Sequence, residues 1–419
     1  MKTKILLIAI NVLLSLSFLP AQTVRTIHVA SPGTLETLVG SDKNTITGLT
    51  LTGTINAADF TPITQMKVLK NLDMSELNID NGTIPEGTFQ NRVMEKIILP
   101  INLRSIGRAA FRNTTLLSLD FTHCHQLEEI GAVAFYDISL TQNTTLDLSH
   151  TKLSRCYGNG HDYNNGTFGG FNSHVILPVG MTILPANSFQ GFKGTLELPS
   201  TLQEIGVNAF RAASLPQQLT LPSSVTTIHE TAFYQADIPL GIQLPSGLKK
   251  IGLGCFQAAK LPSLDFTHCH QLEEIGAVAF YDISLTQNTT LDLSHTKLSR
   301  CYGNGHDRNN GTFGGFTGHV ILPKNLKFLH GDSFAGFRGS VEFSPVLEEI
   351  GGGAFRASIL TKALRLPSSL RVIGDRAFSN AVIPGIEFEG MDNGSLLCVP
   401  AARSASQAIL PQSQEENKH

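Results

Sequence analysis

The stretch Leu198-Pro-Ser-Thr-Leu-Gln-Glu-Ile205-Gly-Val-Asn-Ala-Phe210 decides the fold of this 419-residue chain. It ends in an aliphatic residue, four further residues and a Phe, and this spacing recurs with a new start every 21 to 28 residues. The regular pairs are Ile84/Phe89, Ile106/Phe111, Ile130/Phe135, Leu184/Phe189, Ile205/Phe210, Ile228/Phe233, Ile251/Phe256, Ile275/Phe280, Leu329/Phe334, Ile350/Phe355 and Ile373/Phe378. In two further pairs, Cys156/Phe168 and Cys301/Phe313, a Cys replaces the aliphatic residue and the interval to the Phe is longer. The pattern therefore has thirteen units.

Between these pairs lies a short strand pattern, such as Leu196-Glu197-Leu198-Pro199. The alternation puts both Leu side chains on one face and the middle residue on the other, and the Pro ends the strand because it lacks a backbone donor. One unit of this length cannot bury its own Leu, Ile and Phe, whereas stacked neighbours can share a continuous core. The pattern therefore predicts a solenoid with stacked Ile and Phe columns, roughly 60 Å long for thirteen strands.

A larger duplication overlies the repeats. Residues 118–162 recur letter for letter as residues 263–307, and identity resumes after one difference, Tyr163 against Arg308. Six repeats were thus copied as a unit. Such a copy suits a surface of adjustable length or valency, and it suits a single catalytic centre poorly.

The unit Leu221-Pro-Ser-Ser-Val-Thr-Thr-Ile228-His-Glu-Thr-Ala-Phe233 resembles the BspA-like, or Treponema pallidum-type, leucine-rich repeats. The resemblance covers roughly residues 84–388. It implies a leucine-rich-repeat solenoid with a parallel β-sheet along one face and short strands, turns and loops on the other. It also implies a surface protein, since some members of this class act as adhesins toward host or bacterial partners.

The two ends of the chain differ from the repeats. Residues 1–21 are predicted to be a signal peptide, because Lys2 and Lys4 precede a short apolar core and Ala21 offers a small residue for cleavage. We expect residues 22–83 to form an N-terminal cap with Leu72-Asp73-Met74 as the first strand of the stack. The solenoid would occupy residues 84–389, and residues 390–419 would form a C-terminal cap and tail. With no long apolar segment after the signal, we expect an exported protein without a membrane span, at the cell surface or secreted, with the periplasm as a further possibility.

The middle residues of the strands are predicted to form one row on the exposed face of the sheet. They are Asp73, Ile98, Asp120, Asp147, Ile176, Glu197, Thr220, Gln243, Asp265, Asp292, Ile321, Glu342, Arg365 and Glu387. The row is mainly acidic and could attract a basic protein, an amine-bearing glycan or a divalent cation. Alternatively, its carboxylates only keep an exposed sheet soluble. The candidate binding residues of the row are Asp120, Asp147, Glu197, Asp265, Asp292 and Glu342.

A second candidate is a Gly- and Asn-rich insertion at residues 157–166, repeated at residues 302–311. Such residues favour a protruding loop, and loop side chains often contact partners. The candidate contact residues are Tyr157, His161, Asp162, Tyr302, His306 and Asp307. The spacing does not match a calcium-binding loop, and a simple surface bulge is the alternative.

Zinc is suggested by His123-Cys124-His125 and its copy around Cys269. Alternating side chains on a strand or turn point opposite ways, so the two flanking His cannot readily share a metal with the Cys between them. We therefore expect no metal and no cofactor. The six Cys could form disulfides outside the cytoplasm, but their positions follow the repeat, and we expect buried free thiols.

The sequence contains no signature of a known catalytic site, such as H-E-x-x-H, G-x-S-x-G or a phosphate-binding Gly loop. A formal net charge of -3 also disfavours a general nucleic-acid binder. The predicted function is therefore non-catalytic recognition of an extracellular protein or glycan, as in an adhesin. The alternative is a structural spacer or matrix protein of the cell envelope.

Overall fold

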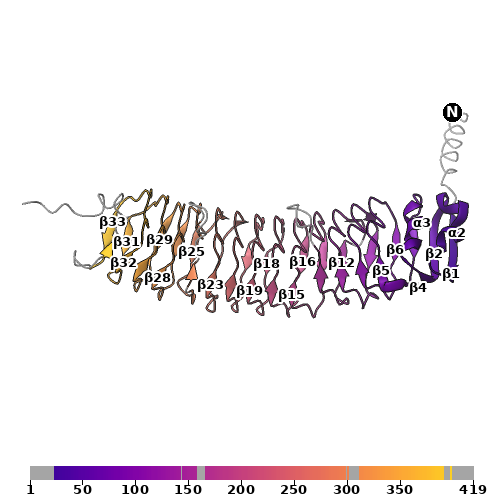
Figure 1. Cartoon of the computed structure of the whole chain (residues 1–419), viewed down its shortest axis with the longest axis horizontal. Coiled ribbons are helices and arrows are strands. Elements are labelled where there is room, and N and C mark those ends of the chain that lie inside the picture. Colours follow the sequence, from indigo (N-terminus) through magenta and orange to yellow (C-terminus); the bar gives the residue numbers. More distant parts are fainter. Residues whose placement is uncertain are drawn as a thin grey trace, which may run out of the picture.

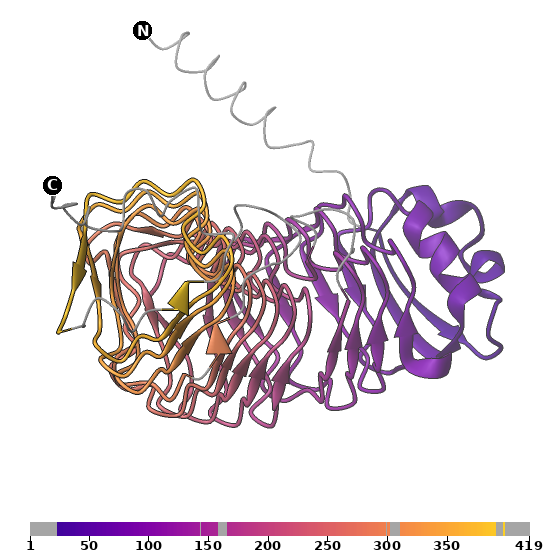
Figure 2. The ribbon, with the colours of Figure 1, turned by 60° about the vertical axis from the view of Figure 1, so that its left-hand side comes forward.

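The protein is a long rod of stacked solenoid turns (Figure 1). The computed structural model describes residues 23–142, 144–157, 166–298, 300–301, 311–390 and 397–398. It is a parallel β-solenoid of about 15 turns, as the repeat predicts. The turns lie one behind the other along the rod, and the short helices of the described residues all lie in the N-terminal part, between Leu35 and Gly82 (Figure 2). Within the described residues, no helix has the length and apolar character needed to cross a membrane.

One series of strands carries the Leu-x-Leu pattern and forms the sheet face on which the predicted row lies. These strands are β1 (Thr23–Val29), β2 (Ile46–Ile55), β3 (Asn71–Asp73), β6 (Lys96–Ile98), β9 (Ser118–Asp120), β12 (Thr145–Asp147), β14 (His174–Ile176), β16 (Thr195–Glu197), β18 (Leu219–Thr220), β20 (Ile242–Gln243), β25 (Thr290–Asp292), β27 (His319–Ile321), β29 (Ser340–Glu342), β31 (Leu364–Leu366) and β33 (Ile386–Phe388). They pair in parallel with the next turn, for example β12 with β14 and β14 with β16.

A second series carries the aliphatic residue, or in two cases the Cys, that begins each Ile/Phe pair, and it ends with β34, which belongs to no pair. Its strands are β5 (Thr83–Ile84), β7 (Ser105–Ile106), β10 (Glu129–Ile130), β13 (Arg155–Cys156), β15 (Ile183–Leu184), β17 (Glu204–Ile205), β19 (Thr227–Ile228), β21 (Lys250–Ile251), β23 (Glu274–Ile275), β26 (Arg300–Cys301), β28 (Phe328–Leu329), β30 (Glu349–Ile350), β32 (Val372–Ile373) and β34 (Leu397–Cys398). The remaining short strands are β4 (Leu77–Ile79), β8 (Thr115–Leu116), β11 (Ser139–Leu140), β22 (Lys260–Leu261) and β24 (Ser284–Leu285).

The Phe residues of the repeat form a continuous ladder through the core. All thirteen, from Phe89 to Phe378, are at most 5% exposed. Successive rings have centroids 4.6 to 6.1 Å apart, with most pairs close to parallel. The predicted Phe column is thus confirmed, and each ring depends on the turns before and after it for its burial.

The N-terminal end is capped by α2 (Leu35–Val39), α3 (Phe60–Gln65) and the 3-10 helices η1 (Gly40–Asn44), η2 (Ala57–Asp59) and η3 (Asp80–Gly82). The buried Asp59 carboxylate ties this cap together by accepting hydrogen bonds from the backbone amides of Gly33 at 2.6 Å and Leu35 at 2.9 Å. Arg92 closes the other end of α3. Arg92 is 8% exposed, and its guanidinium donates to the carbonyl oxygens of Ile63, at 2.8 Å, and Met66.

One expectation about this end is wrong. Residues 72–74 are not the first strand of the stack, because the sheet order is β1-β2-β3-β6-β9. Two longer strands therefore precede β3, and the sheet already begins at Thr23. β1 lacks the Ile/Phe spacing. β2 ends at Ile55, and the buried Phe60 of α3 follows five residues later, so this pair has the spacing although it was not recognised from the sequence.

Each turn of the solenoid bends through positive-φ positions near its Phe. One column of such residues lies two positions after the Phe and includes Asn91, Asn113, Gln235 and Asn380. Asn tolerates this backbone conformation better than other residues with a Cβ, because its short side chain can hydrogen-bond locally. The Asn113 side-chain amide also links adjacent turns, because it donates to Asn91 Oδ1 at 2.9 Å.

We therefore predict that Gln235→Asn stabilises the protein. Gln235 is exposed and has a φ of 55°, so the change relieves backbone strain without disturbing the core. The expected gain in the free energy of unfolding is about 0.5–1 kcal/mol, measured by urea denaturation. Gln257→Asn is the matched control, because Gln257 is not among the positive-φ residues; an equal gain in both variants would contradict this explanation.

Candidate functional site

The predicted row lies on the sheet face, where strand register places its members side by side. Asp73, Ile98 and Asp120 are paired across β3, β6 and β9. The remaining paired groups are Asp147–Ile176–Glu197, Thr220–Gln243, Asp292–Ile321–Glu342 and Arg365–Glu387. All these residues are exposed or half-buried. The register of the row is therefore confirmed within each group.

Asp265 is an exception within this row. It is exposed like its copy Asp120, but residues 263–265 form no strand in the described part of the chain. The preceding residue explains the difference. Leu117 donates its amide to the carbonyl of Glu95 at 3.2 Å, whereas Pro262 stands at the corresponding position of the second copy and has no amide to donate.

The Asp residues of the row also shape the chain that follows them. In each case the carboxylate Oδ1 accepts a hydrogen bond from the backbone amide two residues later. These contacts are Asp73 with Ser75, Asp120 with Thr122, Asp147 with Ser149, Asp265 with Thr267 and Asp292 with Ser294, all at 2.8 or 2.9 Å. This turn requires a short acidic or amide side chain, which explains why the row uses Asp at these strand ends.

The turn contacts lower the pKa of two carboxyl groups, Asp147 and Asp292. Burial alone would raise the pKa of Asp147, but hydrogen bonds from Ser149 and the nearby His150 outweigh it and lower this pKa. Asp292 shows the same balance, with burial opposed by Ser294, His295 and Lys324. Because both folded-state pKa values are depressed, this stabilisation is present above the ordinary Asp pKa of 3.8 and is lost as the pH falls below it.

An aliphatic residue separates the acids in each copy. Ile176 is half-buried between Asp147 and Glu197, and Ile321 lies in the same way between Asp292 and Glu342. Both copies therefore present the order acid, aliphatic residue, acid across three neighbouring strands. The glutamates are the more exposed acids, and Glu197 lies 3.5 Å from His174 Nε2.

The inserted loops fall largely outside the described residues. This applies to His161, Asp162, Tyr302, His306 and Asp307, so their predicted contacts stay predictions. Tyr157, at the start of the first loop, is 46% exposed. Its carbonyl accepts a hydrogen bond from the Thr167 hydroxyl at 3.0 Å, which ties the loop base to the solenoid.

The cysteines belong to the core. Cys124, Cys156, Cys255 and Cys269 are buried free thiols, which confirms the expectation for these four residues. Burial raises the pKa of Cys124 and of Cys156 to about 12 and that of Cys269 to about 11, so all three stay protonated at neutral pH. Over the described ranges, no group of three or more His, Cys, Asp or Glu side chains is arranged to hold a metal ion.

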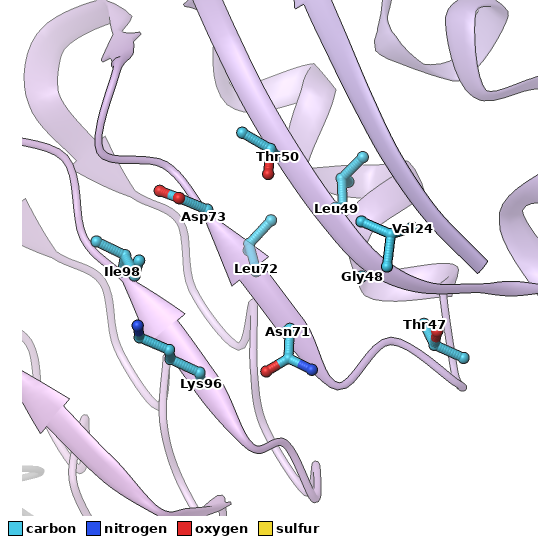
Figure 3. Close-up of a pocket in the computed structure, with 10 residues that line it drawn as sticks. All are labelled: Val24, Thr47, Gly48, Leu49, Thr50, Asn71, Leu72, Asp73, Lys96 and Ile98. Atoms are coloured by element: carbon cyan, nitrogen blue, oxygen red, sulfur yellow. The ribbon is translucent and has the colours of Figure 1, made fainter. Parts of the chain in front are cut away.

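A pocket at the N-terminal end of the same face was missed by the sequence reasoning. It has a volume of about 320 Å³ and lies across β1, β2, β3 and β6 (Figure 3). Its outward-facing lining includes Val24, Thr50, Asn71, Asp73 and Lys96. The available signal was Gly48, since a Gly inside a strand often marks a place where another group approaches closely.

The repeats match the family model of the BspA type leucine rich repeat region over residues 82–165, 182–302 and 315–391. The chain belongs to the BspA-type leucine-rich repeat family. The match covers most of both copied blocks, so the resemblance inferred from the Ile/Phe spacing is confirmed. No curated protein matches this BspA-type chain.

Solved leucine-rich repeat structures are similar to this BspA-type protein at low identity. A leucine-rich repeat protein from Eubacterium ventriosum is 16% identical over 81% of this chain and 77% of its own, with a TM-score of 0.31. One from Bacteroides ovatus is 17% identical over 69% and 84%, with a TM-score of 0.26. The pneumococcal vaccine antigen PcpA is 14% identical over 81% and 79%, with a TM-score of 0.24.

Proposed function

We propose that this BspA-type repeat protein is an exported, non-catalytic bacterial surface protein that recognises a positively charged extracellular protein or glycan with its sheet face. The observation that carries this proposal is the repeated order of acid, aliphatic residue and acid across neighbouring strands. An acidic row attracts a basic partner, while a half-buried Ile provides apolar contact area at its centre. The predicted signal peptide, which lies outside the described residues, supports export.

The duplication makes the proposed surface bivalent. The first copy contains Asp147, Ile176 and Glu197, and the second contains Asp292, Ile321 and Glu342. Six repeats separate them, which corresponds to roughly 29 Å along the rod at the usual spacing of parallel strands. A partner with repeated basic segments would engage both copies, and the second contact would be effectively intramolecular.

A structural spacer is the second candidate, and the turn contacts favour it. Five Asp residues of the row each accept a hydrogen bond from a backbone amide. This local structural role explains the presence of Asp at these positions without any ligand. The glutamates do not share this explanation, because Glu197 and Glu342 make no such turn contact in the described part of the chain. They are therefore the residues that best separate recognition from a purely structural role.

Asp→Asn substitutions test recognition while preserving the fold. The fourfold variant Asp120→Asn, Asp147→Asn, Asp265→Asn and Asp292→Asn removes four charges but retains each Oδ1 acceptor. Purified protein is first screened against arrayed matrix proteins and glycans. We expect a saturable hit whose affinity falls at least about tenfold in the fourfold variant, with a weaker dependence on salt. Glu197→Gln with Glu342→Gln should reduce affinity further.

The control variant removes four exposed acids outside the row, Asp80, Glu230, Asp237 and Glu273, as the corresponding amides. It should bind like the unmodified protein. The pairs Asp120→Asn/Asp147→Asn and Asp265→Asn/Asp292→Asn should each weaken binding of a partner with repeated basic segments, because the second, intramolecular contact is lost. Full binding by the fourfold variant would reject the acidic row as the site and leave the inserted loops, whereas the absence of any hit would favour the spacer.

A further inference from the structure

The sheet face presents the same arrangement of side chains on three sets of strands. Each set has three neighbouring strands and two outward rows, one of which is the order of acid, aliphatic residue and acid. The sets are β3–β6–β9, β12–β14–β16 and β25–β27–β29, and each is paired in register. The first set adds the group Asp73–Ile98–Asp120 to the two copies already described.

The second outward row places a side chain that can carry a positive charge at the centre of each set. It lies two residues before the central Ile on the same strand, and therefore on the same face of the sheet. These central residues are Lys96, His174 and His319. Their row neighbours are uncharged, namely Asn71 and Ser118, Thr145 and Thr195, and Thr290 and Ser340. Figure 3 shows Lys96 and Ile98 of the first set on β6, beside Asn71 and Asp73 on β3.

The His174 ring lies beside an acid of the row. Its Nδ1 is 2.8 Å from the hydroxyl oxygen of Thr195 on β16. Its Nε2 is 3.5 Å from Glu197 Oε1 on the same neighbouring strand. The His174 side chain is 28% exposed and the Glu197 side chain 71%. A proton on Nε2 would therefore place a positive charge at ion-pair distance from a solvent-facing acid of the row.

The second copy anchors His319 through the same ring nitrogen. His319 Nδ1 lies 2.8 Å from the hydroxyl oxygen of Ser340 and 3.2 Å from the carbonyl oxygen of the same residue. A carbonyl oxygen only accepts, so Nδ1 carries the proton of the neutral ring and Nε2 is the atom that gains a second one. Strand register places Glu342 diagonal to His319, as it places Glu197 diagonal to His174.

We propose that His174 and His319 make recognition by the sheet face sensitive to pH, so that a basic partner bound near neutral pH is released in mild acid. This inference rests on the proposed recognition of a basic partner and adds the regulation of that site. An imidazole ordinarily gains its second proton between about pH 8 and 5. Each protonated ring would neutralise one of the two carboxylate charges of its copy and would repel the cations of the partner.

The acids around the two rings keep their charge over this range. They are Asp147 and Glu197 for His174, and Asp292 and Glu342 for His319. The other charged or titratable groups beside these acids are His150 in the first copy, and His295 and Lys324 in the second. Burial alone would raise the pKa of Asp147 and of Asp292, but the turn hydrogen bonds and the nearby basic groups lower both. The first set responds differently, because Lys96 stays charged throughout.

Equilibrium binding of deca-L-lysine to the purified protein tests the proposal. The probe suits the test because its ammonium groups stay protonated, so that its own charge does not change with pH. We expect its affinity to fall at least about threefold between about pH 7.5 and about pH 5.5, since each neutralised surface charge removes a modest attraction.

Two double variants assign this effect to the imidazoles. His174→Asn with His319→Asn removes the proton-binding atoms, and Asn71 shows that Asn occupies this row in the first set. This variant should bind equally well at both pH values. His174→Lys with His319→Lys reproduces the permanent charge of Lys96 and should bind at least about threefold more weakly at both. His150 and His295 remain in every variant, so their contribution is common to all.

His229→Asn is the matched control. His229 forms a pair with Glu204 at 2.7 Å, but this pair belongs to the second strand series and not to the sheet face. The control should keep the pH dependence of the unmodified protein, and circular dichroism at both pH values establishes that each variant is folded. A pH dependence that persists in His174→Asn with His319→Asn would overturn this inference alone. No binding of deca-L-lysine by the unmodified protein near neutral pH would contradict the proposed function as well.

Discussion

Phe233→Ala is expected to lower the free energy of unfolding by about 3–5 kcal/mol. Phe233 is fully buried, and its ring lies 5.2 Å from those of both Phe210 and Phe256. Removing it leaves a cavity in the middle of the ladder, where neither adjacent turn can collapse without losing its own stacking. Urea denaturation followed by circular dichroism measures the loss.

The same variant should also change the cooperativity of unfolding. A solenoid is stabilised mainly by contacts between nearest neighbours, so a weakened turn near the centre can uncouple the two ends. We expect the unfolding transition to broaden or to split in two. Phe328→Ala is the control, because Phe328 is 51% exposed and outside the ladder, and it should change stability by no more than about 0.5 kcal/mol. A loss below about 1 kcal/mol for Phe233→Ala would contradict the role of the ladder.

Arg92→Met is expected to destabilise the N-terminal cap by about 3 kcal/mol. Burial lowers the pKa of the Arg92 guanidinium, and carbonyl oxygens of Ile63 and Met66 replace the water it has lost. Met can occupy part of the volume but cannot donate, so the carbonyl groups of Ile63 and Met66 lose a charged donor and each keep one backbone amide, at 3.3 and 3.2 Å. A hydrogen bond to a charged group contributes about 1.5–3 kcal/mol.

Hydrogen exchange of residues 57–70, together with urea denaturation, measures this effect. We expect faster exchange there and unchanged exchange in the central turns. Arg108→Met is the control, since Arg108 forms an exposed ion pair with Glu86 at 2.9 Å and such pairs contribute at most about 1 kcal/mol. Unchanged exchange near α3 in Arg92→Met would rule out Arg92 as the group that secures the cap.

The repeat was predictable because its signal is local and periodic. The spacing of Ile205 and Phe210, repeated along the chain, determines which side chains point inward and which neighbours they meet. Register then follows, because only one alignment of successive turns places Phe upon Phe. For this reason the sequence correctly predicted the paired order of Asp147, Ile176 and Glu197.

The errors arose where the spacing was absent or a single residue changed the pairing. β1 lacks the Ile/Phe pattern, and the Ile55/Phe60 pair at the end of β2 was not recognised, so the sheet was predicted to start too late. Pro262 removes an amide that Leu117 provides in the first copy, and Asp265 consequently lies outside a strand. The turn contacts of the Asp residues were also missed, although an Asp followed two residues later by Ser or Thr is a recognisable signal.

The sequence by itself determined the solenoid, its family and the row along its sheet face, because a short period repeated many times fixes the inward and outward positions of every turn. Only the tertiary structure decided where that face is hollow and which charged side chains lie together. The pocket joins residues of four strands, and His174 and Glu197 become neighbours only when β14 and β16 pair. Such a site depends on packing between turns, which no periodicity within a turn records.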